Sequence, residues 1–234
     1  MAVIAPFTGF PRDGIQFLAD LAANNDRAWF QPRKAEYERL LKEPLEALCR
    51  DLGERFAQAG LPLRSDPAKS PFRIYRDVRF SADKSPYKTQ VSASFPFTEE
   101  GGGVGGYFHM APGDMFAGGG MWHPEPSRLA AWRRKVVDRT QEVLDVIEDP
   151  AFVETFGEVS GDSLKRLPAG LPAGHPQERL LRLKDVTFGR RLSDAEVMSP
   201  DLPEILTTTY TAAVPLLRLL ASLPAEERAR WLRD

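Results

Sequence analysis

The spacing of hydrophobic residues changes twice along this chain, and this change constrains the fold more than any other feature. Up to about residue 60 the apolar side chains recur at helical spacing, as Ile15, Leu18 and Leu21 do. Over residues 71–122 they alternate with polar side chains, which is the pattern of a half-buried strand. Helical spacing returns after residue 126. The order predicts an α+β fold, with an antiparallel β-meander in the middle of the chain packed against N-terminal and C-terminal helices.

The predicted strands are joined by short segments rich in turn residues. These connections lie at residues 83–86, 100–103 and 112–114, and none has room for a crossover helix. Neighbouring strands are therefore expected to pair antiparallel. The predicted strands of the meander are 72–80, 91–97, 105–111 and 115–122, and a further short strand is expected at 186–189.

Proline and capping residues set the expected helix boundaries. Asp13 is a suitable N-cap for a helix that ends near Ala23, and Pro44 begins or kinks a helix that runs to about residue 59. Pro215 is expected to kink a helix near the C-terminus. The later helical segments are predicted at 127–147, 177–184, 202–223 and 225–231. Because we find no internal repeat and no linker, the whole chain, 1–234, is expected to form a single α+β domain of unknown function.

The composition is that of an ordinary globular protein. The 234 residues carry a formal net charge of −2, so a broad basic surface for coating nucleic acid or membrane is not expected. No stretch approaches the ~20 apolar residues that span a bilayer. The single cysteine, Cys49, excludes an intramolecular disulfide and lies at helical spacing with leucines, so it is predicted to be buried in the core. These features predict a cytoplasmic protein.

Residues 71–89 concentrate positive charge. They hold five arginine or lysine residues and two aspartates, so 5 − 2 gives a local charge of +3, and aromatic residues are interleaved with the charges. Such clustering is typical of a site that holds an anion. The candidate ligand-binding residues are Arg73, Arg76, Asp77, Arg79, Asp83, Lys84, Tyr87, Lys88 and, as an aromatic wall with Tyr87, Trp122.

The expected strand 72–80 raises a question about Arg76. Alternation places Arg76 on the same face as Phe72 and Val78, toward the core. A buried guanidinium must meet a carboxylate, carbonyl groups or a bound anion, or else a bulge turns it outward. The structural interpretation is an arginine–aspartate network, with Asp77 or Asp83, that stabilises the sheet. The functional interpretation is a cradle for phosphate or carboxylate.

The remaining motifs indicate little chemistry. Residues 101–106 match G-x-G-x-x-G, but they open no helix, so a hairpin loop is expected instead of a nucleotide site. The three glycines at 118–120 indicate either a twisted, bulged strand or the close approach of another backbone or ligand. The three histidines show no helical spacing of metal ligands, so neither a metal nor a cofactor is predicted. They are His109, His123 and His175.

Several sequence motifs occur together in this chain. The most specific is R-D-V-R-F-S-A-D-K-S-P-Y-K, and the others include F-T-G-F near the start, N-N followed by W-F, G-G-G-M-W, and H-P followed by L-L-R-L-K. Together they resemble, nearly end to end, a bacterial family of conserved hypothetical proteins, domain of unknown function 2461. The resemblance implies one whole-chain domain, a cytoplasmic setting and no known cofactor. It implies no catalytic residue that could be carried over to this chain.

Three functions remain open from the sequence. The preferred hypothesis is binding of a small phosphate- or carboxylate-bearing ligand at a basic face of the sheet. The first alternative is an interaction module without catalysis, whose basic face docks a protein or a nucleic-acid backbone; the net charge makes nucleic acid the less favoured partner. The second alternative is an enzyme in the same cleft, with Asp77 or Asp83 as base and a lysine as electrostatic stabiliser.

Overall fold

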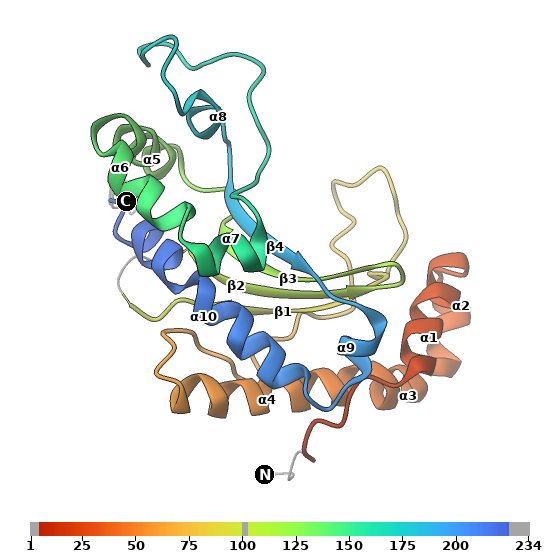
Figure 1. The fold of residues 1–234 in the computed structure, drawn as a ribbon. Helices are drawn as coiled ribbons and strands as arrows, with labels where there is room; N and C mark the ends of the chain where they lie inside the picture. The colour runs from red at the N-terminus through yellow and green to blue at the C-terminus, as the bar shows by residue number, and fades with distance from the viewer. Residues whose placement is uncertain (1–4, 100–102, 225–234) are drawn as a thin grey trace, which may run out of the picture. The chain divides into compact units, whose positions relative to one another are not determined.

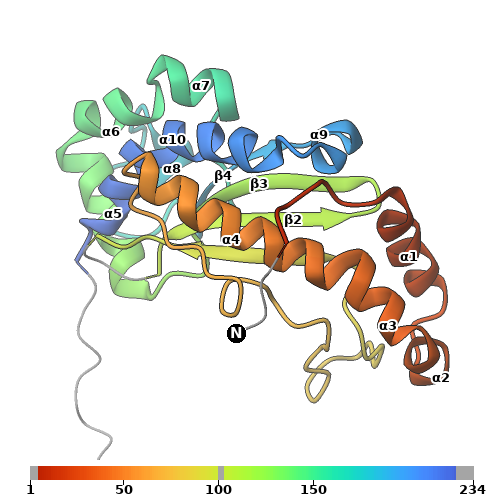
Figure 2. The ribbon, with the colours of Figure 1, turned by 90° about the horizontal axis from the view of Figure 1, so that it is seen from below.

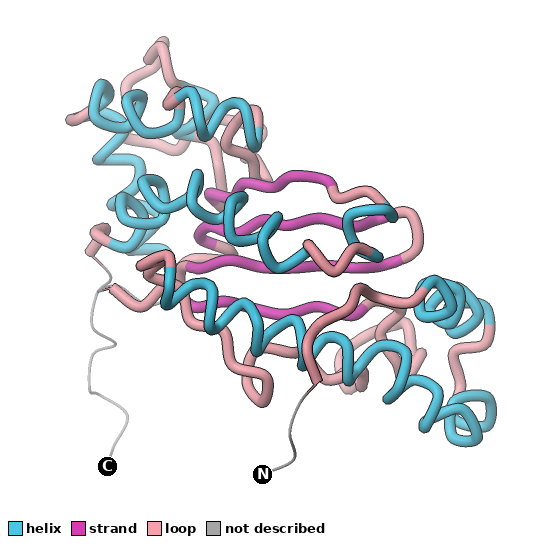
Figure 3. Tube along the Cα trace, turned by 60° about the horizontal axis from the view of Figure 1, so that its bottom comes forward, coloured by secondary structure: helices cyan, strands magenta, loops and turns pink. Residues whose placement is uncertain are grey.

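The computed structural model describes residues 5–99 and 103–224, and Figure 1 shows its elements in chain order. Four strands form one antiparallel sheet in the order β1-β2-β3-β4 (Figure 3). They are β1 (Val91–Pro96), β2 (Gly105–Ala111), β3 (Asp114–Met121) and β4 (Val186–Arg191). The α+β fold is therefore confirmed. The helix expected at 225–231 and two residues of the glycine loop, 101 and 102, lie outside the described residues.

The period-two pattern predicted the strands of the meander correctly where more buried and less buried residues alternate along the chain. In β2 buried and half-buried residues alternate along the whole strand. A tight turn joins β2 to β3, and Gly113 in this turn has a φ of +74°, which glycine adopts without a Cβ clash. The strand expected at 186–189 is present as β4 and extends two residues further.

The strand expected at 72–80 is wrong. This region pairs through isolated antiparallel bridges, one between Pro71 and Ala93 and one between Tyr75 and Tyr87. Phe80, which alternation placed on the core face, is 96% exposed. We call residues 71–90 the basic loop. The predicted basic face of the sheet is therefore a basic loop beside the sheet.

Short side chains explain why the basic loop does not continue as a strand. Asp77 accepts a hydrogen bond from the backbone N–H of Arg79 at 3.3 Å, and Asp83 accepts one from Ser85 at 2.9 Å. In both cases an aspartate bonds the backbone two residues on, which is the geometry of an Asx turn. Such bonds compete with the hydrogen bonds of a β-ladder.

The chain divides into two compact units, each built from three stretches of sequence. Unit 1 consists of Met1–Phe95, Tyr107–Ala117 and Arg190–Tyr210. Unit 2 consists of Pro96–Gly106, Gly118–Gly189 and Thr211–Asp234. The four strands and helix α10 (Leu202–Ala221) each contribute residues to both units.

Unit 1 begins with a series of short helical segments that leads into a long helix (Figure 2). The segments are α1 (Arg12–Ala23), α2 (Arg27–Phe30), the 3₁₀ turn η1 (Gln31–Arg33), α3 (Lys34–Tyr37), the π turn η2 (Glu38–Lys42) and α4 (Glu43–Gln58). Pro11 occupies the N-cap position of α1, so the N-cap expected at Asp13 is wrong; Asp13 lies in the first turn, where its charge suits the helix dipole. Pro44 is the second residue of α4, as expected for a helix start.

The core of unit 1 is built on aromatic rings from three elements. Phe56 of α4, Phe95 of β1 and Tyr210 of α10 contact one another edge to face, with ring centroids 5.6–6.0 Å apart. The hydroxyl of Tyr210 donates a 2.8 Å hydrogen bond to the backbone carbonyl of Tyr107 in β2. Helix α4 and the unit 1 part of α10 therefore pack on the same face of these strands. Cys49 of α4 is fully buried in this core, as predicted.

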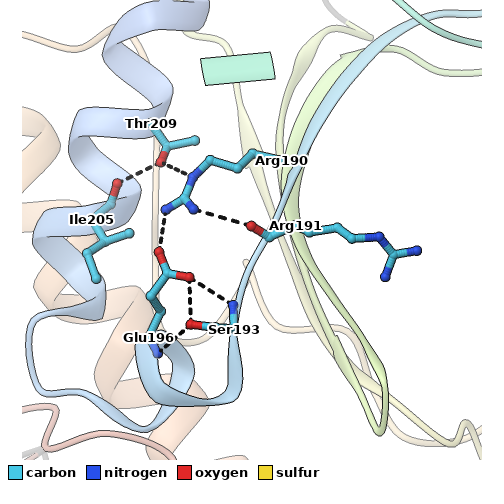
Figure 4. A network of polar contacts seen from close by, with 6 residues as sticks. All are labelled: Arg190, Arg191, Ser193, Glu196, Ile205 and Thr209. Carbon is cyan, nitrogen blue, oxygen red and sulfur yellow. Dashed lines mark hydrogen bonds and ion pairs between the residues drawn. The ribbon is translucent and has the colours of Figure 1, made fainter. Parts of the chain in front are cut away.

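A polar network joins β4 to the following helices of unit 1 (Figure 4). Ser193 caps α9 (Asp194–Met198) and forms a reciprocal capping box with Glu196. Arg190 of β4 donates to the Glu196 carboxylate at 2.8 Å and lies 3.4 Å from the Thr209 hydroxyl of α10. Helix α9 was not among the predicted helices.

In the described part of unit 2 there are four helices besides its part of α10: α5 (Pro126–Asp138), α6 (Thr140–Ile147), α7 (Pro150–Phe156) and α8 (Glu178–Leu181). The single helix expected at 127–147 is therefore wrong. It is interrupted at Arg139, next to Thr140, whose hydroxyl donates to the carbonyl of Val136 at 2.7 Å. That carbonyl is the acceptor that a continuous α-helix would offer to the N–H of Thr140.

The glycines at 118–120 lie where the backbone of β4 comes close. A Cβ on Gly118 would be 2.5 Å from the carbonyl oxygen of Phe188, and one on Gly120 would be 2.2 Å from that of Val186. Gly120 also has a φ of +115°. The close approach of another backbone, one of the sequence interpretations, is therefore observed. Within the described ranges, no helix is both long and apolar enough to cross a bilayer.

Candidate functional site

A pocket of about 560 Å³ opens beside the basic loop in unit 1. Its wall comes from the end of α1, the segment after it and both arms of the basic loop. Five of the nine predicted site residues line it: Arg76, Asp77, Asp83, Tyr87 and Lys88. The pocket also receives polar side chains that were not predicted as site residues, including Asn25, Ser85 and Gln90.

Tyr87 and Asn25 attach the basic loop to the helices. Tyr87 is 1% exposed, and its ring stacks on Phe30 of α2 with centroids 4.1 Å apart. The side-chain amide of Asn25 donates to the carbonyl of Tyr87 at 2.9 Å and accepts from its N–H at 3.1 Å. Asn25 thus forms hydrogen bonds with both the N–H and the C=O of Tyr87, as the backbone of a neighbouring strand would. This double contact positions the adjacent pocket residues.

Two of the three arginines of the basic loop are paired within the loop. Arg79 forms a two-pronged contact with Asp77, with Nε–Oδ1 and Nη2–Oδ2 distances of 3.0 and 2.7 Å. The Nη1 group of Arg76 donates to Asp83 and, at 3.2 Å, to the carbonyl of Ser85. Arg76 is half-buried and lies in neither a strand nor the core. These pairs are the arginine–aspartate network of the structural interpretation.

The same contacts hold both aspartates in the ionised state. Hydrogen bonds from Ser85, and then from Arg76, keep the pKa of Asp83 well below its usual range. The side chain of Arg79, and then its backbone N–H, lower the pKa of Asp77. A carboxylate with a lowered pKa accepts protons poorly at neutral pH. The enzyme alternative, with an aspartate as general base, gains no support from this geometry.

Lys88 is a half-buried cation in the pocket wall. Its Nζ lies 5.0 Å from the centroid of the Phe72 ring, and no carboxylate forms an ion pair with it among residues 5–99 and 103–224. Burial, and then the charge of Arg73, lower the pKa of Lys88. The charges of Lys88 and Arg73 therefore repel each other, and no carboxylate among the described residues compensates Lys88.

The other predicted site residues lie outside the pocket lining. Lys84 donates to the carbonyl of Val78 at 3.0 Å and so crosses the basic loop. Arg73 is exposed, and Arg79 is engaged with Asp77 as described above. Trp122 belongs to unit 2, where it is 64% exposed beside His123. No group of three or more histidine, cysteine or acidic residues that could hold a metal occurs in the part of the chain described by the structure.

A family model described as "Conserved hypothetical protein (DUF2461)" matches residues 13–218. The match therefore includes α1 except for its first residue, the basic loop and every residue of the pocket lining. No curated protein and no solved structure matches the chain.

Proposed function

The chain belongs to the family of conserved hypothetical proteins DUF2461, whose description assigns no activity, and we propose from the pocket that it binds a small phosphate- or carboxylate-bearing ligand. The observation that carries the proposal is Lys88, a half-buried cation in the wall of a polar pocket with no carboxylate partner among the described residues. A bound anion would supply the missing counter-charge.

Arg76 can complete such a site. Both of its contacts within the basic loop use Nη1, and neither Nε nor Nη2 meets an acceptor among the residues that the structure describes. A guanidinium with two donors left is suited to a two-pronged contact with carboxylate or phosphate. Lys88 would add a point charge from the same wall.

The size and the polarity of the pocket agree with a metabolite-sized ligand. Its volume of about 560 Å³ lies within the range of small-molecule sites. The lining adds neutral hydrogen-bonding side chains from Asn25, Ser85, Thr89 and Gln90 to the charged groups. These groups could bind the uncharged polar parts of the same ligand.

Thermal denaturation with phosphate, pyrophosphate and citrate tests the proposal. A ligand at 100 times its Kd stabilises the folded state by about 2.7 kcal/mol, which in a chain of this length raises Tm by about 5–10 °C. We expect at least one probe to stabilise the native protein and Lys84→Gln, but not Lys88→Gln. Lys84→Gln removes the same charge from the same loop at a residue that does not line the pocket, so it is the matched control. Equal stabilisation of both variants, or of neither the native protein nor the control, would contradict the proposal.

One observation favours the interaction module as a second candidate. Phe80 is 96% exposed in the basic loop, and the guanidinium of Arg79 lies 5.8 Å from its ring centroid. Such a tip could dock an acidic partner protein, and the near-neutral charge of the chain makes nucleic acid the less favoured partner. Binding of a partner at Phe80 and Arg79 should be weaker at physiological salt than at low salt. It should also be weaker in Phe80→Ala than in the native protein, but unchanged in Lys88→Gln. For either function we propose a cytoplasmic setting, supported by the single, buried and unpaired Cys49.

A further inference from the structure

Unit 2 contains an imidazole–carboxylate pair that the proposed ligand site does not use. His123 follows β3, and Asp185 directly precedes β4, 62 positions later. Asp185 accepts a 2.7 Å hydrogen bond from the backbone N–H of His123 through Oδ1, and the same oxygen lies 3.5 Å from His123 Nδ1. The Asp185 side chain is 1% exposed, whereas the His123 side chain is 71% exposed. A buried carboxylate therefore holds the backbone of a histidine whose imidazole faces solvent.

Asp185 carries an unsatisfied polar atom. Its Oδ2 is buried and has no hydrogen-bond partner among the described residues. Gly161 packs directly against Asp185, since a Cβ on this glycine would be 2.3 Å from the Asp185 carbonyl oxygen. Buried polar atoms without partners destabilise a fold and are rare outside sites with a role of their own.

His123 has an unusual backbone conformation at the same place. Its φ is +45°, and it is the one non-glycine residue with a positive φ within residues 5–99 and 103–224. A positive φ is uncommon for residues other than glycine, and among them asparagine, aspartate and histidine adopt it most often. The position thus combines a buried carboxylate oxygen without a partner and a backbone conformation that is uncommon outside glycine.

The hydrogen-bond partners distinguish His123 chemically from the other two histidines. In His175, Nδ1 accepts a 3.1 Å hydrogen bond from the N–H of Gln177, so Nε2 carries the proton. In His123, Nδ1 lies 3.5 Å from Asp185 Oδ1, so a proton on Nδ1 would face the carboxylate and would leave the lone pair on the exposed Nε2. His109 is only 15% exposed, with its nitrogens 3.4 Å from the Tyr107 hydroxyl and 3.8 Å from Asp114.

We propose that His123 is the general base of a hydrolytic site for acyl compounds, and that Asp185 is its positioning residue. As a water oxygen bonds to the acyl carbon, His123 Nε2 accepts a proton from that water, and Asp185 stabilises the imidazolium. The bond from the acyl carbon to the leaving oxygen then breaks, and the proton passes from Nε2 to that oxygen. The Trp122 ring, 64% exposed and with its centroid 4.3 Å from that of His123, offers a flat surface for an aromatic leaving group.

NMR of nitrogen-labelled histidine tests the arrangement directly, because ring-nitrogen shifts report which nitrogen carries the proton. We expect neutral His123 to carry it on Nδ1 and His175 to carry it on Nε2. Asp185→Asn should shift His123 away from the Nδ1–H form. A His123 that carries its proton on Nε2 in the native protein would overturn the proposal.

Hydrolysis of p-nitrophenyl acetate tests the chemistry. His123→Asn removes the imidazole while keeping a residue suited to a positive φ, so this variant is expected to fold. We expect it to hydrolyse the ester about a hundredfold more slowly than the native protein, since general-base catalysis typically contributes 10²–10⁴-fold. His175→Gln should leave the rate unchanged. Native and His123→Asn proteins with the same rate, both folded by circular dichroism, would refute the proposal even if Asp185→Asn failed to fold.

Discussion

Replacing Asn25 by aspartate exchanges one NH₂ group for an oxygen and tests how the basic loop is held. In the native protein this NH₂ donates to the carbonyl of Tyr87 at 2.9 Å, and the amide oxygen accepts from the N–H of Tyr87 at 3.1 Å. Aspartate keeps the acceptor but places a negatively charged oxygen against the Tyr87 carbonyl. The contact is partly buried, so water replaces the lost donor only in part.

The magnitude follows from that contact. A lost hydrogen bond that leaves a buried partner unsatisfied costs about 1–3 kcal/mol, and partial exposure places Asn25→Asp near the middle, at about 2 kcal/mol. In a chain of this length, that corresponds to a Tm about 4–8 °C lower at pH 7. Asn24→Asp is the matched control, because the side chain of Asn24 donates to the carbonyl of Asp20 at an exposed position. Its Tm is expected to fall by much less.

The pH dependence gives the sharper test. In Asn25→Asp, only the protonated form of the introduced carboxyl can donate to the Tyr87 carbonyl, so folding raises the pKa of this carboxyl above its unfolded value of about 3.9. The destabilisation is therefore absent below the unfolded pKa and develops as the pH rises through the folded pKa. Differential scanning calorimetry of the native and variant proteins across this range should show the Tm difference closing in acid. A difference that stays constant with pH, or none at pH 7, would refute the role assigned to Asn25.

Three further outcomes are expected. Burial acts to raise the pKa of Glu196, but hydrogen bonds from Ser193 and Arg190 outweigh it and lower the pKa. The native protein should therefore be more stable than Glu196→Gln by about 1–2 kcal/mol at pH 7 in urea denaturation. This difference should begin to shrink as the pH falls below the unfolded value of about 4.3 and be lost as the pH falls through the lower folded pKa. Gly120→Ala should prevent folding or lower the free energy of unfolding by several kcal/mol. Gly113 also has a positive φ but has open space around it, so Gly113→Ala should lower that free energy by only about 1 kcal/mol. Burial raises the pKa of the Cys49 thiol to about 12, so Ellman's reagent should react with it only after denaturant unfolds the protein.

The spacing of apolar residues predicted the strands in which that spacing corresponds to burial. It failed in the basic loop, where hydrogen bonds from side chains determine the backbone conformation. The strands β1, β2 and β3 are within a residue or two of expectation; burial alternates along all of β2 and along the first half of β3, and every second residue of β1 from Val91 is buried. In the basic loop, the Asx turns of Asp77 and Asp83 replace the ladder, although the apolar spacing is that of a strand. The spacing of Ser193 and Glu196 matches a capping box and could have located α9.

The candidate site was accessible from the sequence only in part. The charge cluster located the basic loop, and pairing of arginine with aspartate was one of the two interpretations it allowed. The contact between Asn25 and Tyr87 spans 62 positions, so no local pattern reveals it. The same separation divides His123 from Asp185. Contacts of this kind depend on the tertiary fold, which spacing along the chain does not encode.

The division of each unit into three stretches has a consequence for biosynthesis. The last stretch of unit 1 ends at Tyr210, whose ring lies between Phe56 and Phe95 in the core. A nascent chain on the ribosome therefore cannot complete that core until residue 210 has been translated, and the apolar faces of its early helices stay uncovered until then. Premature stop codons before this tyrosine should consequently yield aggregation-prone fragments that cellular proteases remove, with no functional remnant of either half.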